Sequence, residues 1–152
     1  MGKDEVLKSI RELFAQQEAA IQQHPDQLVA VYYGARDGFL SQPGEWTPGT
    51  DLERDEFLMV FRYLLSSSFI AAWYHLAGDK ANRDKAAQSC AIVIAGLRLD
   101  PTKVFQKHME FELNWRRIME QEGVAPTGGA GCVGLFVIAL LIGVGLAVAA
   151  II

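Results

Sequence analysis

The sequence has few cysteines and no run of basic residues. Its only cysteines are Cys90 and Cys132, which is too few for a disulfide framework and favours a reducing compartment. The net charge is −4, and without a basic stripe the chain offers no electrostatic footprint for nucleic acid, which we exclude as a partner. The first residues are polar and lead directly into an amphipathic segment, so we expect no secretory signal peptide.

Sequence motifs for catalysis are also missing. The glycine run at residues 128–131 lacks the strand and the lysine of a phosphate-binding loop. Cys90 lies among small and apolar residues, with no basic neighbour in the sequence to lower its pKa. The acidic residues at 51–56 fit the first turn of a helix, where the helix dipole favours negative charge, better than a cation site. We therefore expect neither an enzyme nor a cofactor.

A metal site could be built only around His75 and His108, with Glu112 one helical turn after His108. No Glu-x-x-His motif of the di-iron type and no cysteine pair accompanies these residues. We expect packed histidines with hydrogen-bond partners and no metal.

One long hydrophobic run is present, at residues 132–152. Its 21 residues (152 − 132 + 1) include no charged side chain. As a helix the run would span about 31 Å, the thickness of a bilayer's hydrocarbon core. We expect a single-pass transmembrane tail anchor with the N-terminus in the cytosol, running through Cys132, Phe136, Gly143 and Ile152. A flexible tether at residues 123–131 would join it to a cytosolic domain at residues 1–122.

Two features of this run leave alternatives open. Ala139, Gly143 and Ala147 are spaced by four residues, which would allow two anchor helices to pair as a homodimer, although small residues are common in membrane spans in any case. Cys132 is either a palmitoylation site next to the membrane or an ordinary residue of the span.

The first 122 residues show helical periodicity and no strand pattern. Helices are expected at about residues 4–22, from Pro25, at 82–99, and from Pro101 to just before Gly123. Thr50 and Glu53 form a capping box that predicts the start of a long central helix, and the serines at 66–68 mark a place where this helix could break in two. The fold class is therefore all-α, with about five to six helices and one C-terminal transmembrane helix.

Residues 73–101 partly match a tetratricopeptide repeat, a unit of about 34 residues made of two helices. The match starts at an aromatic residue and closes with a proline 28 residues later. Lys80 and Ser89 depart from the expected tyrosine and alanine. The matching positions are Trp73, Leu76, Ala77, Val93, Gly96 and Pro101.

A short helical domain with one such repeat, a glycine-bearing tether and a hydrophobic tail resembles the mitochondrial fission protein 1 family. The resemblance implies a tetratricopeptide-like bundle on the cytosolic face of the mitochondrial outer membrane or the peroxisome. It also implies a docking role for organelle fission machinery. Tails of that family usually end in basic residues, whereas this sequence ends in Ile152, so the endoplasmic reticulum remains an alternative location.

Two functions follow as hypotheses. The first is a tail-anchored membrane adaptor whose helical domain docks a cytosolic protein partner, with Arg36, Tyr63 and Tyr74 as the expected contacts. The second is a membrane-acting regulator or pore-forming protein in which the hydrophobic residues 57–77 also enter the bilayer.

Overall fold

The computed structural model describes residues 2–41 and 52–126, which form five α-helices and contain no strand. The all-α prediction is confirmed for this part of the chain. The expected anchor residues Cys132, Phe136, Gly143 and Ile152 lie outside the described residues. The helices are α1 (Lys3–Ile21), α2 (Asp26–Ser41), α3 (Arg54–Leu76), α4 (Lys80–Ala95) and α5 (Pro101–Gln121).

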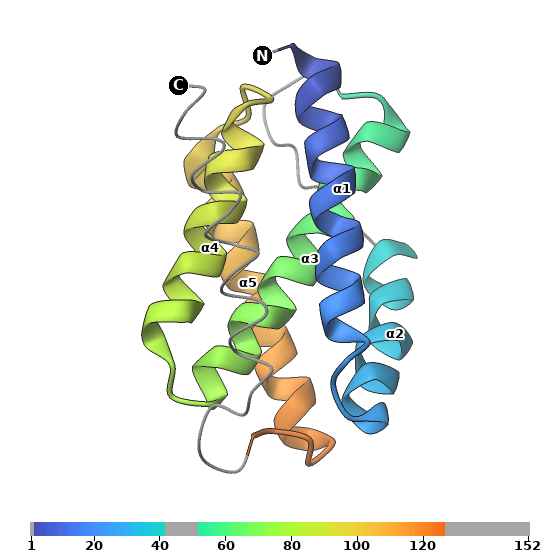
Figure 1. Ribbon diagram of the computed structural model, residues 1–152, viewed down its shortest axis with the longest axis vertical. Coiled ribbons are helices and arrows are strands. Elements are labelled where there is room, and N and C mark those ends of the chain that lie inside the picture. The colour runs from blue at the N-terminus through green and yellow to red at the C-terminus, as the bar shows by residue number, and fades with distance from the viewer. Residues whose placement is uncertain (1, 42–51, 127–152) are drawn as a thin grey trace.

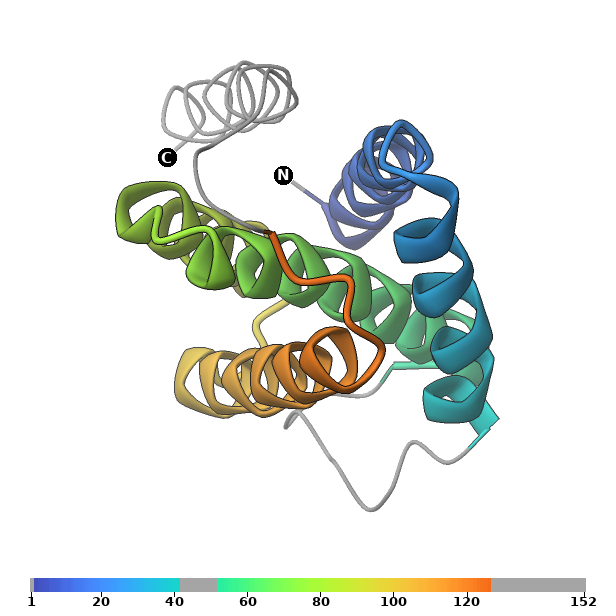
Figure 2. The ribbon, with the colours of Figure 1, turned by 90° about the horizontal axis from the view of Figure 1, so that it is seen from below.

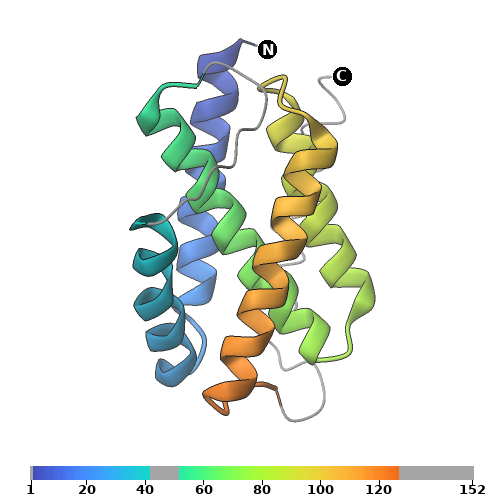
Figure 3. The same cartoon turned by 180° about the vertical axis from the view of Figure 1, so that it is seen from behind.

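The central element is α3, which contacts all four of the other helices. The view along the bundle shows α1 and α4 on one side of α3, α5 on the opposite side, and α2 beside α1 (Figure 2). The side views in Figures 1 and 3 show α3 crossing the molecule obliquely between these neighbours. This position explains why apolar residues point in every direction from α3, since each face of the helix meets a different partner.

The serines at 66–68 do not break α3, so the predicted division into two helices is wrong. All three serines are buried, and each hydroxyl finds an acceptor within the bundle. Ser66 donates to Oε1 of Gln17 on α1, Ser67 donates to the carbonyl of Ala86 on α4 at 3.1 Å, and Ser68 donates to the carbonyl of Leu65 at 3.0 Å. A helix keeps buried serines when their hydroxyls are satisfied in this way.

The ends of two helices show which sequence signals were informative. Asp100 caps α5 by accepting from the backbone N–H of Thr102 at 2.9 Å, and Pro101 occupies the first turn, as predicted. The predicted start of α3 is displaced. Glu53 is the N-cap itself, and Glu56 reaches back to accept from the Glu53 backbone N–H at 2.9 Å.

The tetratricopeptide arrangement is not shown by the described helices. Trp73, the opening aromatic of the sequence match, lies in the last turn of α3, and α3 begins 19 residues earlier (73 − 54). A tetratricopeptide unit instead opens on the first of its two helices. What the structure does contain is an antiparallel pair, α3 and α4, joined by a short turn with Gly78 in a left-handed conformation at φ 75°.

Within the described residues, one helix is long and apolar enough to cross a membrane, and it is α3. Of its most apolar 18-residue window, 72% is buried inside the bundle. The core helix of a soluble bundle has the same length and composition, so this observation by itself is weak support for a span.

Candidate functional site

An open groove lies between α2 and the C-terminal end of α5. It encloses about 560 Å³, within the range of binding sites for small ligands or a few side chains. The polar residues Gln27 and Glu122 lie among otherwise apolar lining residues. The apolar lining comprises Ala30, Val31, Gly34, Ala35, Ile118 and Val124.

The groove stays open because α2 packs on one side only. Leu28 and Tyr32 are the buried residues of α2, and the Tyr32 ring contacts Phe69 of α3 and Trp115 of α5. The residues on the groove side are small, so no bulky side chain fills the space: Ala30 and Gly34 are both exposed and stand one helical turn apart. A Cβ atom added to Gly34 would meet no atom within 4 Å.

The wall of the groove on the α5 side is formed by the turn that ends this helix. Gly123 adopts φ 68°, and the backbone N–H of Val124 then donates to the carbonyl of Met119 at 3.0 Å. This is the hydrogen bond of a Schellman motif, in which the residue after the glycine folds back onto the helix. It brings Val124 next to Ile118 at the groove.

A second and smaller cleft of about 280 Å³ lies between α4 and α5. Phe105 borders it and is 44% exposed, which makes it one of three large hydrophobic residues exposed on the described surface. Arg83 and Asp84, also at the cleft, form an ion pair with each other at 3.4 Å. The cleft is therefore a second candidate surface, although half the size of the groove.

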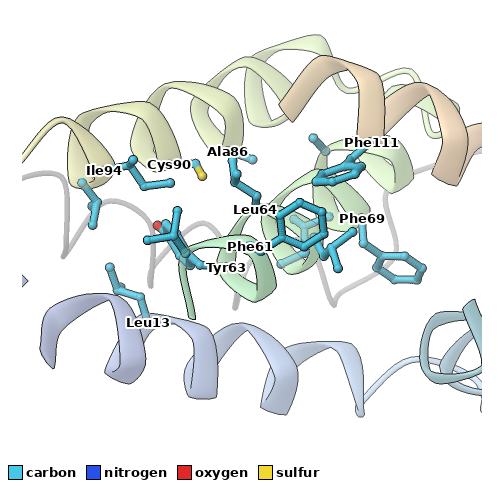
Figure 4. Packing of buried hydrophobic residues seen from close by; sticks show 14 of the residues in the cluster. Leu13, Phe61, Tyr63, Leu64, Phe69, Ala86, Cys90, Ile94 and Phe111 are labelled. Carbon is cyan, nitrogen blue, oxygen red and sulfur yellow. The ribbon is translucent and has the colours of Figure 1, made fainter. Parts of the chain in front are cut away.

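Two of the three residues expected to contact a partner lie in the interior. Tyr63 is 1% exposed and points between α1 and α4, close to Leu13 and Ile94 (Figure 4). Tyr74 is 3% exposed. Burial raises the pKa of Tyr63 well above its ordinary value and that of Tyr74 to about 12. A partner docked on the surface of this fold would touch neither side chain, because bulky aromatic residues of α3 supply the core.

Arg36 is half-buried and already engaged within the bundle. Its Nη1 donates to Oε1 of Glu18 on α1 at 2.7 Å, and its guanidinium carbon lies 4.9 Å from the ring centre of Tyr33. Tyr32 also donates to the same Glu18 oxygen at 3.1 Å. These hydrogen bonds connect α2 to α1. A role of Arg36 in partner binding stays a prediction.

A buried ionic cluster joins α3, α4 and α5. Glu112 on α5 has no exposed surface, and its Oε1 accepts from Nε of Arg83 on α4 at 2.7 Å. Arg116 donates to Nε2 of His75 at 2.6 Å, so this histidine nitrogen carries no proton. Burial, helped by the positive charge of Arg116, lowers the pKa of His75. The neutral histidine therefore extends the cluster to the end of α3.

His108, buried on α5, lies near Arg83 of the same cluster. Its Nε2 lies 3.2 Å from the hydroxyl of Ser67. The Ser67 hydroxyl donates its only proton to the carbonyl of Ala86. The His108 ring proton is therefore on Nε2, which donates to the Ser67 oxygen. Burial and the nearby Arg83 lower the pKa of His108 to about 4, and the side chain is neutral at pH 7.

The two histidines and Glu112 do not assemble into a metal site in the described part of the chain. His75 pairs with Arg116, His108 with Ser67 and Glu112 with Arg83. No group of three or more histidine, cysteine, aspartate or glutamate side chains within residues 2–41 and 52–126 is arranged to hold a metal ion. The cluster is an ion-pair network in which Glu112 lies close to the guanidinium groups of Arg83 and Arg116.

Comparison with known proteins gives no relative: no family model, no curated protein and no solved structure matches the chain. Function is therefore argued from the geometry alone. The groove was missed by sequence reasoning, because none of the expected partner contacts Arg36, Tyr63 and Tyr74 lines it. The available signal was the pair of small residues Ala30 and Gly34 at helical spacing.

Proposed function

We propose that this protein is a membrane-anchored adaptor whose helical bundle docks a cytosolic protein in the groove between α2 and α5. The groove is the observation that carries the proposal. Its lining along α2 runs from Gln27 to Ala35, about 12 Å at 1.5 Å per residue, which matches two turns of a partner helix. An amphipathic helix that lays its apolar face into such a groove is a common mode of peptide recognition.

The anchor in this proposal is the uncharged segment at residues 132–152. Anchoring would concentrate the bundle at one membrane and turn a weak contact with a partner into a local one. The mitochondrial outer membrane or the peroxisome is the proposed location, with the endoplasmic reticulum as the alternative. Organelle fission is the process suggested by the sequence resemblance.

The anchor is tested by tagging the N-terminus of the full chain with a fluorescent protein. The intact chain should label one organelle. A variant with Leu141→Lys and Val144→Lys should be diffuse, because each lysine at the centre of a span costs roughly 2.5 to 3.5 kcal/mol. A matched variant with Leu141→Ile and Val144→Ile should label like the intact chain. A diffuse signal from the intact chain would contradict the proposal.

Docking is tested with a photoreactive amino acid at Gln27, which is exposed at the groove. Irradiation of cells should give discrete adducts of higher mass. Gly34→Leu fills the groove and should abolish them. Gly38→Leu is the matched control, since Gly38 lies on the same helix, also has free space around it and does not line the groove. Adducts that persist in Gly34→Leu would argue against docking in the groove.

The second function, a membrane-acting regulator or pore former, is favoured by one observation, namely the length and apolar composition of α3. Insertion of α3 would require the bundle to open and Ser67 of α3 to lose its hydrogen bond to Ala86 of α4. Release of a trapped dye from vesicles by the full chain would support this function. A double-cysteine cross-link that holds α3 to α4 should then prevent the release, and intact vesicles at all protein concentrations would exclude it.

A further inference from the structure

We infer that the partner docked between α2 and α5 is a cationic helix, which places a lysine or arginine beside Glu122 and its apolar face over Ala30 and Gly34. The inference rests on the proposed function and adds the chemistry of the partner to it. The shape of the groove accepts any apolar helix of the right size. The charge at one end of the groove then selects among such helices.

The two ends of the groove differ in charge. Because α2 and α5 run in opposite directions, Gln27 in the first turn of α2 and Glu122 directly after α5 belong to the same end (Figures 1 and 3). Asp26, next to Gln27, adds a second carboxylate near this end. Glu122 is the only charged residue among those that line the groove. The groove is therefore acidic at this end and uncharged along the rest of its length.

The chain supplies no cation to balance Glu122. The last turn of α5 contains no basic residue, although the C-terminus of a helix favours one. Within residues 2–41 and 52–126, Glu122 takes part in no ion pair, and Arg36, the single cation of α2, donates to Glu18 and Asp37. The remaining residues of the sequence contain no lysine or arginine. A partner is thus the available source of the counter-charge.

The N-terminus of α2 does not replace that cation. The positive end of its helix dipole lies at the same end of the groove, but Asp26 already occupies its first turn. A carboxylate at the C-terminus of a helix is unfavourable, because the dipole is negative there. A basic side chain of the partner would offset this repulsion at Glu122, whereas an acidic one would increase it. The bundle should therefore distinguish between partners of opposite charge.

The test uses the full chain in phosphatidylcholine nanodiscs and two labelled peptides of about four helical turns. Both peptides carry leucines along one face. One has lysines at both ends of that face, and the other has glutamates at the same positions. Fluorescence anisotropy should show that the lysine peptide binds at least about fivefold more tightly, since an exposed ion pair is worth up to about this factor and like charges repel. Empty nanodiscs measure binding to the lipid.

Two charge-reversal variants locate the effect. Glu122→Lys should reverse the preference, because it repels the lysine peptide and attracts the glutamate peptide. Glu120→Lys is the matched control, since Glu120 is exposed in the same turn of α5 and does not line the groove. It should leave both affinities within about twofold of the parent. Lysine is favourable at the end of a helix, so both variants should fold, as circular dichroism will show.

Three results would overturn the inference. They are equal binding of the two peptides by the parent, no binding of either peptide, and the same effect of Glu122→Lys and Glu120→Lys. Failure of the adaptor function is measured separately, by the photoadducts at Gln27 in cells. Adducts that form in the parent and persist undiminished in Glu122→Lys would leave the adaptor function standing and contradict a cationic partner. Absence of adducts in the parent would contradict both.

Discussion

The Arg83 guanidinium donates from Nε to Oε1 of Glu112 over 2.7 Å and so links α4 to a carboxylate on α5 that has no exposed surface. Arg116, one turn further along α5, lies 4.0 Å from the same oxygen and bonds to His75. A single carboxylate in the middle of α5 thereby lies close to the last turn of α3 and the first turn of α4. Its charge is tolerated in the interior only because these cations surround it.

Removal of Arg83 should therefore be costly. Arg83→Met leaves Glu112 buried without its closest cation, and we expect a loss of about 3 to 5 kcal/mol in the free energy of unfolding. Urea denaturation of the full chain in mild detergent, followed by circular dichroism, measures it. The double variant Arg83→Met with Glu112→Gln should recover more than half of the loss.

The control for this prediction is Lys80→Met. Lys80 also forms an ion pair on α4, with Asp84, but its side chain is 81% exposed. Exposed pairs contribute up to about 1 kcal/mol, so this change should be small. Equal losses for Arg83→Met and Lys80→Met would contradict the assigned importance of the buried pair.

Stability should fall with acid because His108 is buried in its neutral form. Its pKa of about 4 in the folded state lies below the ordinary 6.5, so the unfolded chain binds the extra proton between these values. The contribution is complete above pH 6.5 and is lost as pH falls towards 4. Between pH 7.5 and pH 5 the loss should be about 2 kcal/mol.

The measurement is urea denaturation at both pH values for the parent and for His108→Gln, which keeps a side-chain donor for Ser67. His24 and His75 also have lowered pKa values and remain in both proteins, so the difference between the two isolates His108. If the parent and His108→Gln lose the same stability on acidification, His108 is not the responsible group.

Trp115 should be among the most sensitive residues of the core. It is fully buried, and its Nε1 donates to the carbonyl of Leu65 and the hydroxyl of Ser68, both at 3.1 Å. Trp115→Phe removes these bonds and part of the ring, for an expected loss of about 1 to 3 kcal/mol. Trp115→Ala should cost about 3 to 5 kcal/mol. Thermal and urea denaturation measure both losses in the free energy of unfolding. Trp73→Phe changes a half-buried residue and should lower the free energy of unfolding by less than Trp115→Phe.

Cys90 should be unreactive in the folded protein. It is completely buried, and burial raises the pKa of its thiol to about 12, so the reactive thiolate is scarce at pH 8. In a Cys132→Ser variant, where Cys90 is the only thiol, iodoacetamide should label the chain in urea and not in native buffer. Mass spectrometry counts the label. Rapid native labelling would show that the α3–α4 interface opens readily.

The sequence by itself determined the helical character of residues 2–41 and 52–126. Apolar spacing and the Asp100–Pro101 signal depend on neighbours within a few residues, and the resulting helix bounds agree with the structure to within four residues. The central place of α3 was also readable, because a helix that is apolar on every face must be surrounded.

Only the tertiary structure decided which side chains meet. Whether Tyr63 lies on the surface or in the core depends on α1 and α4, which are distant in the sequence. Ser66 and Ser67 can be buried within α3 because Gln17 and Ala86, on other helices, accept their protons. The groove exists because Ala30 is small and exposed and a Cβ atom added to Gly34 would meet no atom within 4 Å. Local periodicity fixes which residues share a face of a helix, whereas the packing of distant helices fixes what covers that face.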